Sequence, residues 1–123
     1  MKQLSNNYNL EERTAQFGEK IIKFCKEIKQ DAITKSLINQ LVRSRTSIGA
    51  NYMEANSASS KRDFINFFTH SLKSANESKV WLVLLKDTNK GNREESDWLL
   101  NELIEIANVL ASSIITLKGK NKS

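Results

Sequence analysis

The sequence predicts an all-α protein that folds as an antiparallel up-down-up-down four-helix bundle. Its 123 residues contain no proline and only four glycines, and proline is the residue that most strongly interrupts a helix. Apolar residues recur at intervals of three and four, and no alternating run joined by an Asn-Gly or Asp-Gly turn indicates a hairpin. Two separate cores would each be small in a chain of this length, so we expect one domain over residues 1–123.

The first helix is predicted over residues 10–30, where the helical pattern is cleanest. Asn9 precedes the pattern and can cap the first turn. The single cysteine, Cys25, lies beside an apolar stripe, so we interpret it as a buried structural thiol. The stripe is spaced by four and three residues in alternation: Leu10, Thr14, Phe17, Ile21, Phe24 and Ile28.

The second helix, predicted over residues 33–56, has two apolar sides where a surface helix normally has one. Leu37, Leu41, Ile48, Tyr52 and Ala55 form the first side, and Val42, Thr46, Gly49 and Met53 form the second. A polar seam runs between them within a sector of roughly 100°. We define this seam as the following residues, with Glu77 of the next helix as the expected cross-helix partner: Gln40, Arg43, Ser44, Ser47, Asn51, Glu54 and Glu77.

The seam allows two readings. In the first, it is a buried polar network that fixes the register at a helix or subunit interface. In the second, it is a strip that contacts phosphates or bases through Arg43 and Arg45 together with the amides. The seam carries few positive charges for a nucleic-acid site, which favours the structural reading.

The third helix is predicted over residues 61–88, after serines that can supply its N-cap. Phe64, Phe68, Ser71, Ala75, Ser78, Leu82 and Leu85 form its inner face. Val80, Trp81 and Leu84 project in other directions, and large apolar residues away from a core indicate a subunit contact. Asn89 and Gly91 are the residues expected to end this helix.

The fourth helix is predicted over residues 93–117 and begins with acidic residues, as the helix dipole favours. A short basic tail follows over residues 118–123. The helix has a core stripe that is widened by a second set of apolar residues: Leu99, Leu103, Ile106, Leu110, Ile114 and Leu117, then Leu100, Ile104, Ala107, Ala111 and Ile115. Such a width exceeds what one bundle needs, so we expect a homo-oligomer.

Residue patterns that support catalysis or cofactor binding are missing from the sequence. The glycines are isolated, so they form no phosphate-binding loop. The single histidine, His70, has Phe67 where a metal-binding bundle would place a glutamate three residues earlier. We therefore expect no metal, no cofactor and no enzymatic activity, with His70 at the surface or at an interface.

The net charge of +5 and the pI near 9.4 favour anionic partners. The basic residues expected to contact RNA or DNA are Arg43, Arg45, Lys61, Arg62 and Lys73. The first residues lack the apolar segment of a signal peptide, and no apolar run approaches the ~20 residues of a membrane span. We expect a cytoplasmic location and no membrane association.

Three runs of residues resemble the four-helix-bundle proteins related to the intervening-sequence protein of bacterial large-subunit (23S) ribosomal RNA. The resemblance covers about residues 10–117. One departure is visible at the end of the second helix, where many relatives have Glu-Gly and this chain has Glu54-Ala55. The runs are Gln40–Ser44 with Ser47–Ala55, Asp63–Phe68 and Ser74–Leu82.

The resemblance implies a barrel-like homopentamer of four-helix bundles. It also implies kinship with the accessory protein of diversity-generating retroelements, which works with a reverse transcriptase and binds nucleic acid. The leading hypothesis is therefore a non-enzymatic oligomeric protein that binds RNA or DNA. The alternative is an interaction scaffold or accessory subunit for a partner enzyme such as a reverse transcriptase.

Overall fold

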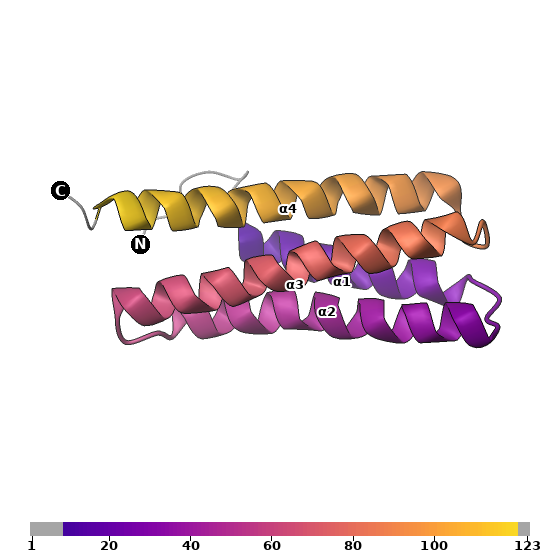
Figure 1. Cartoon of the computed structure of the whole chain (residues 1–123), viewed down its shortest axis with the longest axis horizontal. Coiled ribbons are helices and arrows are strands. Elements are labelled where there is room, and N and C mark those ends of the chain that lie inside the picture. The colour runs from indigo at the N-terminus through magenta and orange to yellow at the C-terminus, as the bar shows by residue number, and fades with distance from the viewer. Residues whose placement is uncertain (1–8, 121–123) are drawn as a thin grey trace.

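The computed structural model describes residues 9–120, and these form four α-helices and no strand. The helices are α1 (Leu10–Lys26), α2 (Ala32–Asn56), α3 (Lys61–Asp87) and α4 (Arg93–Lys120). They run alternately in opposite directions, with the α1–α2 and α3–α4 connections at one end and the α2–α3 connection at the other (Figure 1). The predicted all-α class is confirmed, and the arrangement is that of an antiparallel bundle.

α1 is shorter than the sequence predicts, because it ends at Lys26 and not at residue 30. The N–H groups of Glu27 and Ile28 donate to the carbonyls of Phe24 and Cys25, three positions earlier, which tightens and ends the last turn. Ile28 is then packed in the core, 4% exposed. With 17 residues against 25, 27 and 28 in the others, α1 covers only part of the bundle's length (Figure 1).

α4 differs from its predicted range in the other direction, because it continues to Lys120 and not to residue 117. The first part of the predicted basic tail, residues 118–120, is therefore helical. The remainder of that tail, residues 121–123, lies outside the described residues.

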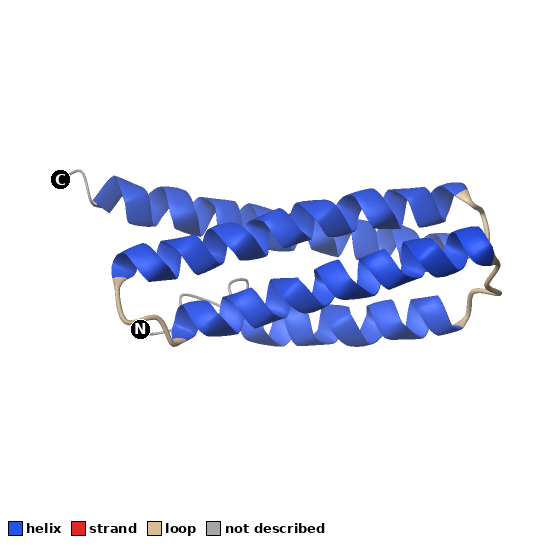
Figure 2. Ribbon diagram, turned by 60° about the horizontal axis from the view of Figure 1, so that its bottom comes forward, coloured by secondary structure: helices blue, strands red, loops and turns tan. Residues whose placement is uncertain are grey.

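The core is built mostly from the predicted inner stripes, with Ile38 and Ile65 added, and its buried residues form one cluster. The four helices that contribute to it lie side by side along the length of the bundle (Figure 2). Near the middle of the bundle, the residues that α3 contributes to the core are small, and Ser71 and Ala75 are fully buried there. The larger fully buried side chains are Phe17, Phe24, Ile21, Leu41, Ile48, Leu82, Leu85, Leu99, Leu103, Ile106 and Leu110.

Among the described residues, α4 over 93–119 is long and apolar enough to span a membrane by length and composition, since an 18-residue window within it has a mean hydropathy of 1.4. One such helix is weak support for a membrane span, because the core helix of a bundle passes the same test. Leu99, Leu103 and Leu110 of this helix are buried in the bundle.

Helix caps fix where each helix begins. The predicted cap Asn9 accepts a hydrogen bond from the N–H of Glu12, and Ser60 does the same for Asp63 at the start of α3. In the α3–α4 loop, Asn89 adopts a left-handed backbone with φ of 58°, and Gly91 lies so close to α1 that an added Cβ would be 2.6 Å from Phe24 Cζ. The predicted breakers are therefore confirmed as loop residues.

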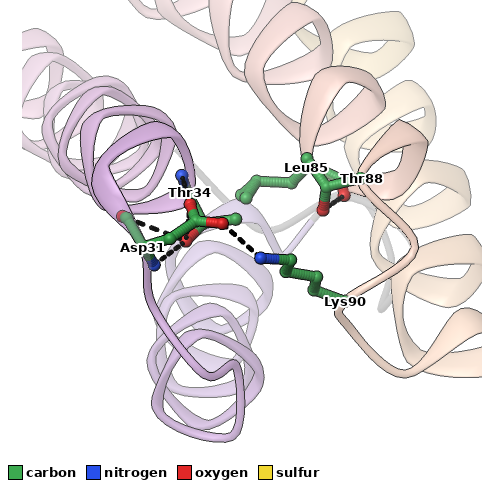
Figure 3. Close-up of polar contacts among 5 residues, drawn as sticks. All are labelled: Asp31, Thr34, Leu85, Thr88 and Lys90. Carbon is green, nitrogen blue, oxygen red and sulfur yellow. Dashed lines mark hydrogen bonds and ion pairs between the residues drawn. The ribbon is translucent and has the colours of Figure 1, made fainter.

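The N-cap of α2, Asp31, was not predicted from the sequence. It also joins the α1–α2 loop to the α3–α4 loop. Asp31 and Thr34 form a reciprocal capping box, with Thr34 N–H to Asp31 Oδ1 at 2.9 Å and Asp31 N–H to Thr34 Oγ1 at 2.8 Å. The ammonium group of Lys90, in the α3–α4 loop, reaches across to the same Asp31 carboxylate (Figure 3). At the end of α3, the hydroxyl of Thr88 donates to the carbonyl of Leu85. The Asp31 carboxylate thus links the α1–α2 connection to the α3–α4 connection at this end of the bundle.

Asp31 makes the stability of the bundle end depend on pH. The ion pair with Lys90, followed by the hydrogen bond from the Thr34 N–H, holds the pKa of the Asp31 carboxyl well below its ordinary value. A lowered native pKa adds stability that is complete above the unfolded pKa, about 3.9, and is lost as pH falls through the native pKa.

We predict that Asp31→Asn, which retains a capping oxygen, is less stable than the wild type at pH 7, and that this difference narrows as the pH falls from about 4 toward 2. Urea denaturation at a series of pH values measures this difference. Asp63→Asn is the matched control, since Asp63 also lies in the first turn of a helix and forms no ion pair within residues 9–120. A constant difference between Asp31→Asn and the wild type at all pH values would contradict the prediction.

Candidate functional site

The α2–α3 contact is the most extensive helix pair in the bundle and is lined by serines. Ser44 Oγ and Ser78 Oγ are 2.7 Å apart, and Ser74 Oγ donates to Ser47 Oγ at 2.8 Å. One turn further, Ser71 Oγ donates to the carbonyl of Ile48 at 2.8 Å. Small side chains let the two helix backbones approach closely, and each hydroxyl in this series has a partner. We name these five serines the serine ladder: Ser44, Ser47, Ser71, Ser74 and Ser78.

The remaining residues of the predicted seam do not enter the α2–α3 contact. Asn51 is half-buried and donates from Nδ2 to the carbonyl and hydroxyl of Ser47 on its own helix. Gln40, Arg43, Glu54 and Glu77 are exposed. Among the described residues, no hydrogen bond or ion pair joins Arg43 to Glu77 or Glu54. The structure therefore brings together the small members of the seam and leaves the long ones in solvent.

Four of the five basic residues proposed for nucleic-acid contact are exposed: Arg43, Lys61, Arg62 and Lys73. The fifth, Arg45, is half-buried against α1, and its Nε has no hydrogen-bond partner among the described residues. It fits there because Gly18 has no side chain. A Cβ at Gly18 would lie 2.5 Å from Arg45 Nη1. Arg45 is therefore less exposed than the other four, because the space left by a glycine on another helix accommodates its guanidinium.

Apolar side chains lie on the outer surface of α3 and α4. Val80 is 55% exposed, Ile115 is 71% exposed, and Val83, Leu84 and Ile104 are about 40% exposed. Trp81, expected to project outward with Val80 and Leu84, is instead half-buried against the core.

The position of this apolar surface follows from the Lys86–Asp97 ion pair, 2.6 Å long, which joins α3 to α4. Val83 lies one turn before Lys86, and Ile104 lies two turns after Asp97, so both fall on the α3–α4 side of the bundle. Ile115 is eleven residues beyond Ile104 and shares its face of α4. We name Val83, Ile104 and Ile115 the α3–α4 apolar surface.

The α1–α4 side is held by a bidentate ion pair. Arg13 donates from Nη2 to Glu102 Oε1 at 2.8 Å and from Nε to Oε2 at 3.0 Å. Pairing with Glu102 raises the pKa of Arg13 above its ordinary value, against the opposing effect of desolvation.

Two turns along α1, Lys20 Nζ lies 4.9 Å from the centroid of the Trp98 ring. A surface hollow of about 130 Å³, which we name the Trp98 hollow, is lined by Lys20, Lys23, Glu95, Trp98 and Leu99. Sequence periodicity identified Leu99 as a core residue but did not group it with the other four, because the five residues come from the first and last helices and meet only in the folded chain.

Two residues considered for chemistry are placed away from any cluster of reactive groups. Cys25 is buried as predicted, and burial raises the pKa of its thiol to about 11, an effect that the nearby charge of Arg45 only partly offsets. A thiol in this state is unreactive. His70 is exposed on α3, and residues 9–120 contain no group of three metal-ligating side chains.

These features place the chain among antiparallel helical-bundle proteins whose central helix pair is joined by small polar residues. The family model of the 23S rRNA-intervening sequence protein matches residues 6–112, so the chain belongs to this family. No curated protein matches the sequence.

The chain is also similar to a solved protein of unknown function from the S23 ribosomal protein family of Bacteroides thetaiotaomicron. That similarity has 36% sequence identity and a TM-score of 0.76, covering 85% of this chain and 97% of the other. The family resemblance drawn from the seam and its neighbouring runs is thereby confirmed.

The serine ladder predicts which substitutions the α2–α3 contact tolerates. Ser78→Leu should lower the free energy of unfolding by about 1–3 kcal/mol, because the fully buried Ser78 has no room for a larger side chain. Ser78→Ala should cost about 1 kcal/mol, since Ser44 retains its hydrogen bond to the carbonyl of Leu41.

Urea denaturation measures both variants, and Ser36→Leu, at an exposed position of α2, is the control that should change stability by less than about 0.5 kcal/mol. A Ser78→Leu protein as stable as the wild type would show that the two helices are not closely packed there.

Proposed function

We propose that the chain is a non-enzymatic, cytoplasmic protein that binds RNA or DNA through exposed basic residues and acts as a homo-oligomer. Membership in the 23S rRNA-intervening sequence protein family supports a nucleic-acid partner. The net charge of +5 supports an anionic partner in general. The observation that carries the proposal is the group of exposed cations on α2 and α3.

Three of these cations, Arg43, Arg62 and Lys73, lie on one part of the surface. The Ser47–Ser74 hydrogen bond fixes the register of α2 against α3, and Lys73 is adjacent to Ser74 while Arg43 is one turn from Ser47. Arg62 and Lys73 are eleven residues apart and therefore lie on the same face of α3. None of Arg43, Arg62 and Lys73 forms an ion pair within residues 9–120. Their charges are available to phosphate groups.

We predict salt-dependent binding to RNA or duplex DNA at low micromolar protein, because phosphate contacts release counterions. The triple variant Arg43→Gln/Arg62→Gln/Lys73→Gln should bind more weakly. Its plot of log affinity against log salt should be flatter by about 0.7–0.9 for each contact removed. Fluorescence anisotropy of labelled ribosomal RNA and of a DNA duplex measures both quantities.

The matched control is Lys26→Gln/Lys29→Gln/Lys35→Gln, which removes the same charge from other exposed positions. Equal weakening in the two triple variants would show that net charge alone attracts the nucleic acid. Absence of salt-dependent binding in the wild type would refute the proposed function.

A second candidate function is an interaction scaffold or accessory subunit for a partner enzyme such as a reverse transcriptase. The α3–α4 apolar surface favours this candidate, because exposed apolar side chains grouped on one side of a protein are typical of protein interfaces. Recovery of a protein without nucleic acid in a pull-down from native cells would favour the scaffold over nucleic-acid binding.

The same apolar surface supports the proposed homo-oligomer, for which the family resemblance implies a pentamer. We predict a solution mass of about 70 kDa by light scattering, five copies of the 14.0 kDa chain. The double variant Ile104→Lys/Ile115→Lys should dissociate the assembly while retaining its helix content. The control Thr116→Lys changes an exposed residue of the same helix that is five turns after Trp98 and therefore lies on the α1–α4 side. A mass near that of one chain for the wild type would refute the oligomer.

A further inference from the structure

The Trp98 hollow has a composition that the packing of the bundle does not require. Trp98 is 44% exposed, although the helix pair α1–α4 is already held by the Arg13–Glu102 ion pair and by the buried Leu99. Its indole N–H has no hydrogen-bond partner within residues 9–120. A large aromatic ring that is about half exposed to water offers a stacking surface to a planar ligand.

The charged groups around the ring are arranged asymmetrically. Lys20 and Lys23 come from α1, and Glu95 comes from α4, one turn before Trp98. Neither Lys23 nor Glu95 forms an ion pair among the described residues. The nearby acids Glu102 and Asp97 are occupied by Arg13 and Lys86. The α1 wall of the hollow is therefore basic and free to meet an anion.

The size of the hollow limits what can occupy it. A volume of about 130 Å³ is smaller than the roughly 300–1,000 Å³ of sites that enclose whole small molecules. It suits one flat group of a longer ligand. An unpaired nucleotide in a single strand has this chemistry, because its base is a planar group attached to a backbone of negatively charged phosphates. Aromatic stacking beside basic residues is how proteins commonly bind such strands.

We propose that the Trp98 hollow binds an unpaired base of single-stranded nucleic acid, with the base stacked on Trp98 and the adjoining phosphates held by Lys20 and Lys23. This inference rests on the proposed function and assigns it a second contact, on the opposite side of the bundle from Arg43 and Lys73. Glu95 repels phosphate from the α4 wall, so the backbone of the strand runs along α1.

In the free protein the ammonium group of Lys20 lies over the Trp98 ring. A cation–π contact at an exposed site is weak, and the lysine side chain is long and flexible. When a base stacks on the ring, Lys20 moves from the ring to a phosphate. The contact seen without ligand is thus exchanged for two contacts with the strand.

The test compares two single-stranded RNA oligonucleotides of equal length, one complete and one abasic, which keeps the phosphates and lacks the bases. The wild type should bind the complete strand more tightly. Trp98→Ala should weaken binding of the complete strand by roughly 5-fold or more and leave the abasic strand unchanged. Trp98→Phe, which retains a stacking ring, should recover most of the affinity.

Two further measurements separate stacking from charge. Lys20→Gln and Lys23→Gln should each flatten the salt dependence for both strands by about 0.7, whereas Lys35→Gln on α2 should not. In a Trp81→Phe background, where Trp98 is the single tryptophan, the complete strand should quench tryptophan fluorescence and the abasic strand should not. Far-UV circular dichroism verifies that every variant is folded.

The two proposals fail in different ways. If folded Trp98→Ala binds both strands like the wild type and Trp98 fluorescence does not respond, the hollow is not a base site, and binding through Arg43, Arg62 and Lys73 still stands. If the wild type binds neither strand nor duplex at low salt, the proposed function and this inference are both overturned.

Discussion

The close contact of α2 with α3 is the constraint on which the rest of the bundle depends. Serines replace large apolar residues along the line where the two helices meet, and their hydroxyls bond to each other or to backbone carbonyls. A buried hydroxyl without a hydrogen bond would carry a desolvation cost of about 1–3 kcal/mol. Because every serine of the ladder is hydrogen-bonded, the two helices approach closely without this cost. The register set by Ser44–Ser78 and Ser47–Ser74 then fixes which residues of the two helices face outward together.

A consequence of this close pair is the distribution of apolar residues elsewhere. Ser71, Ala75 and Ser78 make part of the buried face of α3 small. Large buried side chains come from all four helices, among them Phe17 of α1 and Leu103 of α4. The larger apolar residues of α3 that do not point inward, Val80 and Val83, remain partly exposed. Ile115, near the C-terminal end of α4, lies on the α3–α4 side of the bundle and is also exposed.

Features that depend on a single helix were predictable from the sequence. The four-and-three spacing of Phe17, Ile21 and Phe24 predicts a buried stripe, and all three are buried. Asn9 and Ser60 were expected as caps because a capping bond spans only three residues. Features that depend on two helices were not. The Asp31–Lys90 pair joins loops far apart in the chain, and the burial of Arg45 depends on Gly18 of another helix. Likewise, the spacing that grouped Gln40, Arg43 and Glu54 with the serines did not reveal that they lie outside the contact.

The order of the helices around the bundle determines how the proposed roles can coexist. α2 packs on α3, α3 on α4, and α1 on both α2 and α4, so the α2–α3 side and the α1–α4 side face away from each other. The exposed cations Arg43 and Lys73 lie on the first, Trp98 lies on the second, and the α3–α4 apolar surface lies between them. An assembly formed through that intermediate side would cover Val83 and Ile104 while leaving both polar sides in solvent. A single strand that contacts the Trp98 hollow of one copy would then reach the α2–α3 cations only by passing around the bundle or by crossing to another copy. A strand that makes both contacts without passing around one bundle must cross to another copy, so the proposed oligomer would link the two proposed surfaces physically.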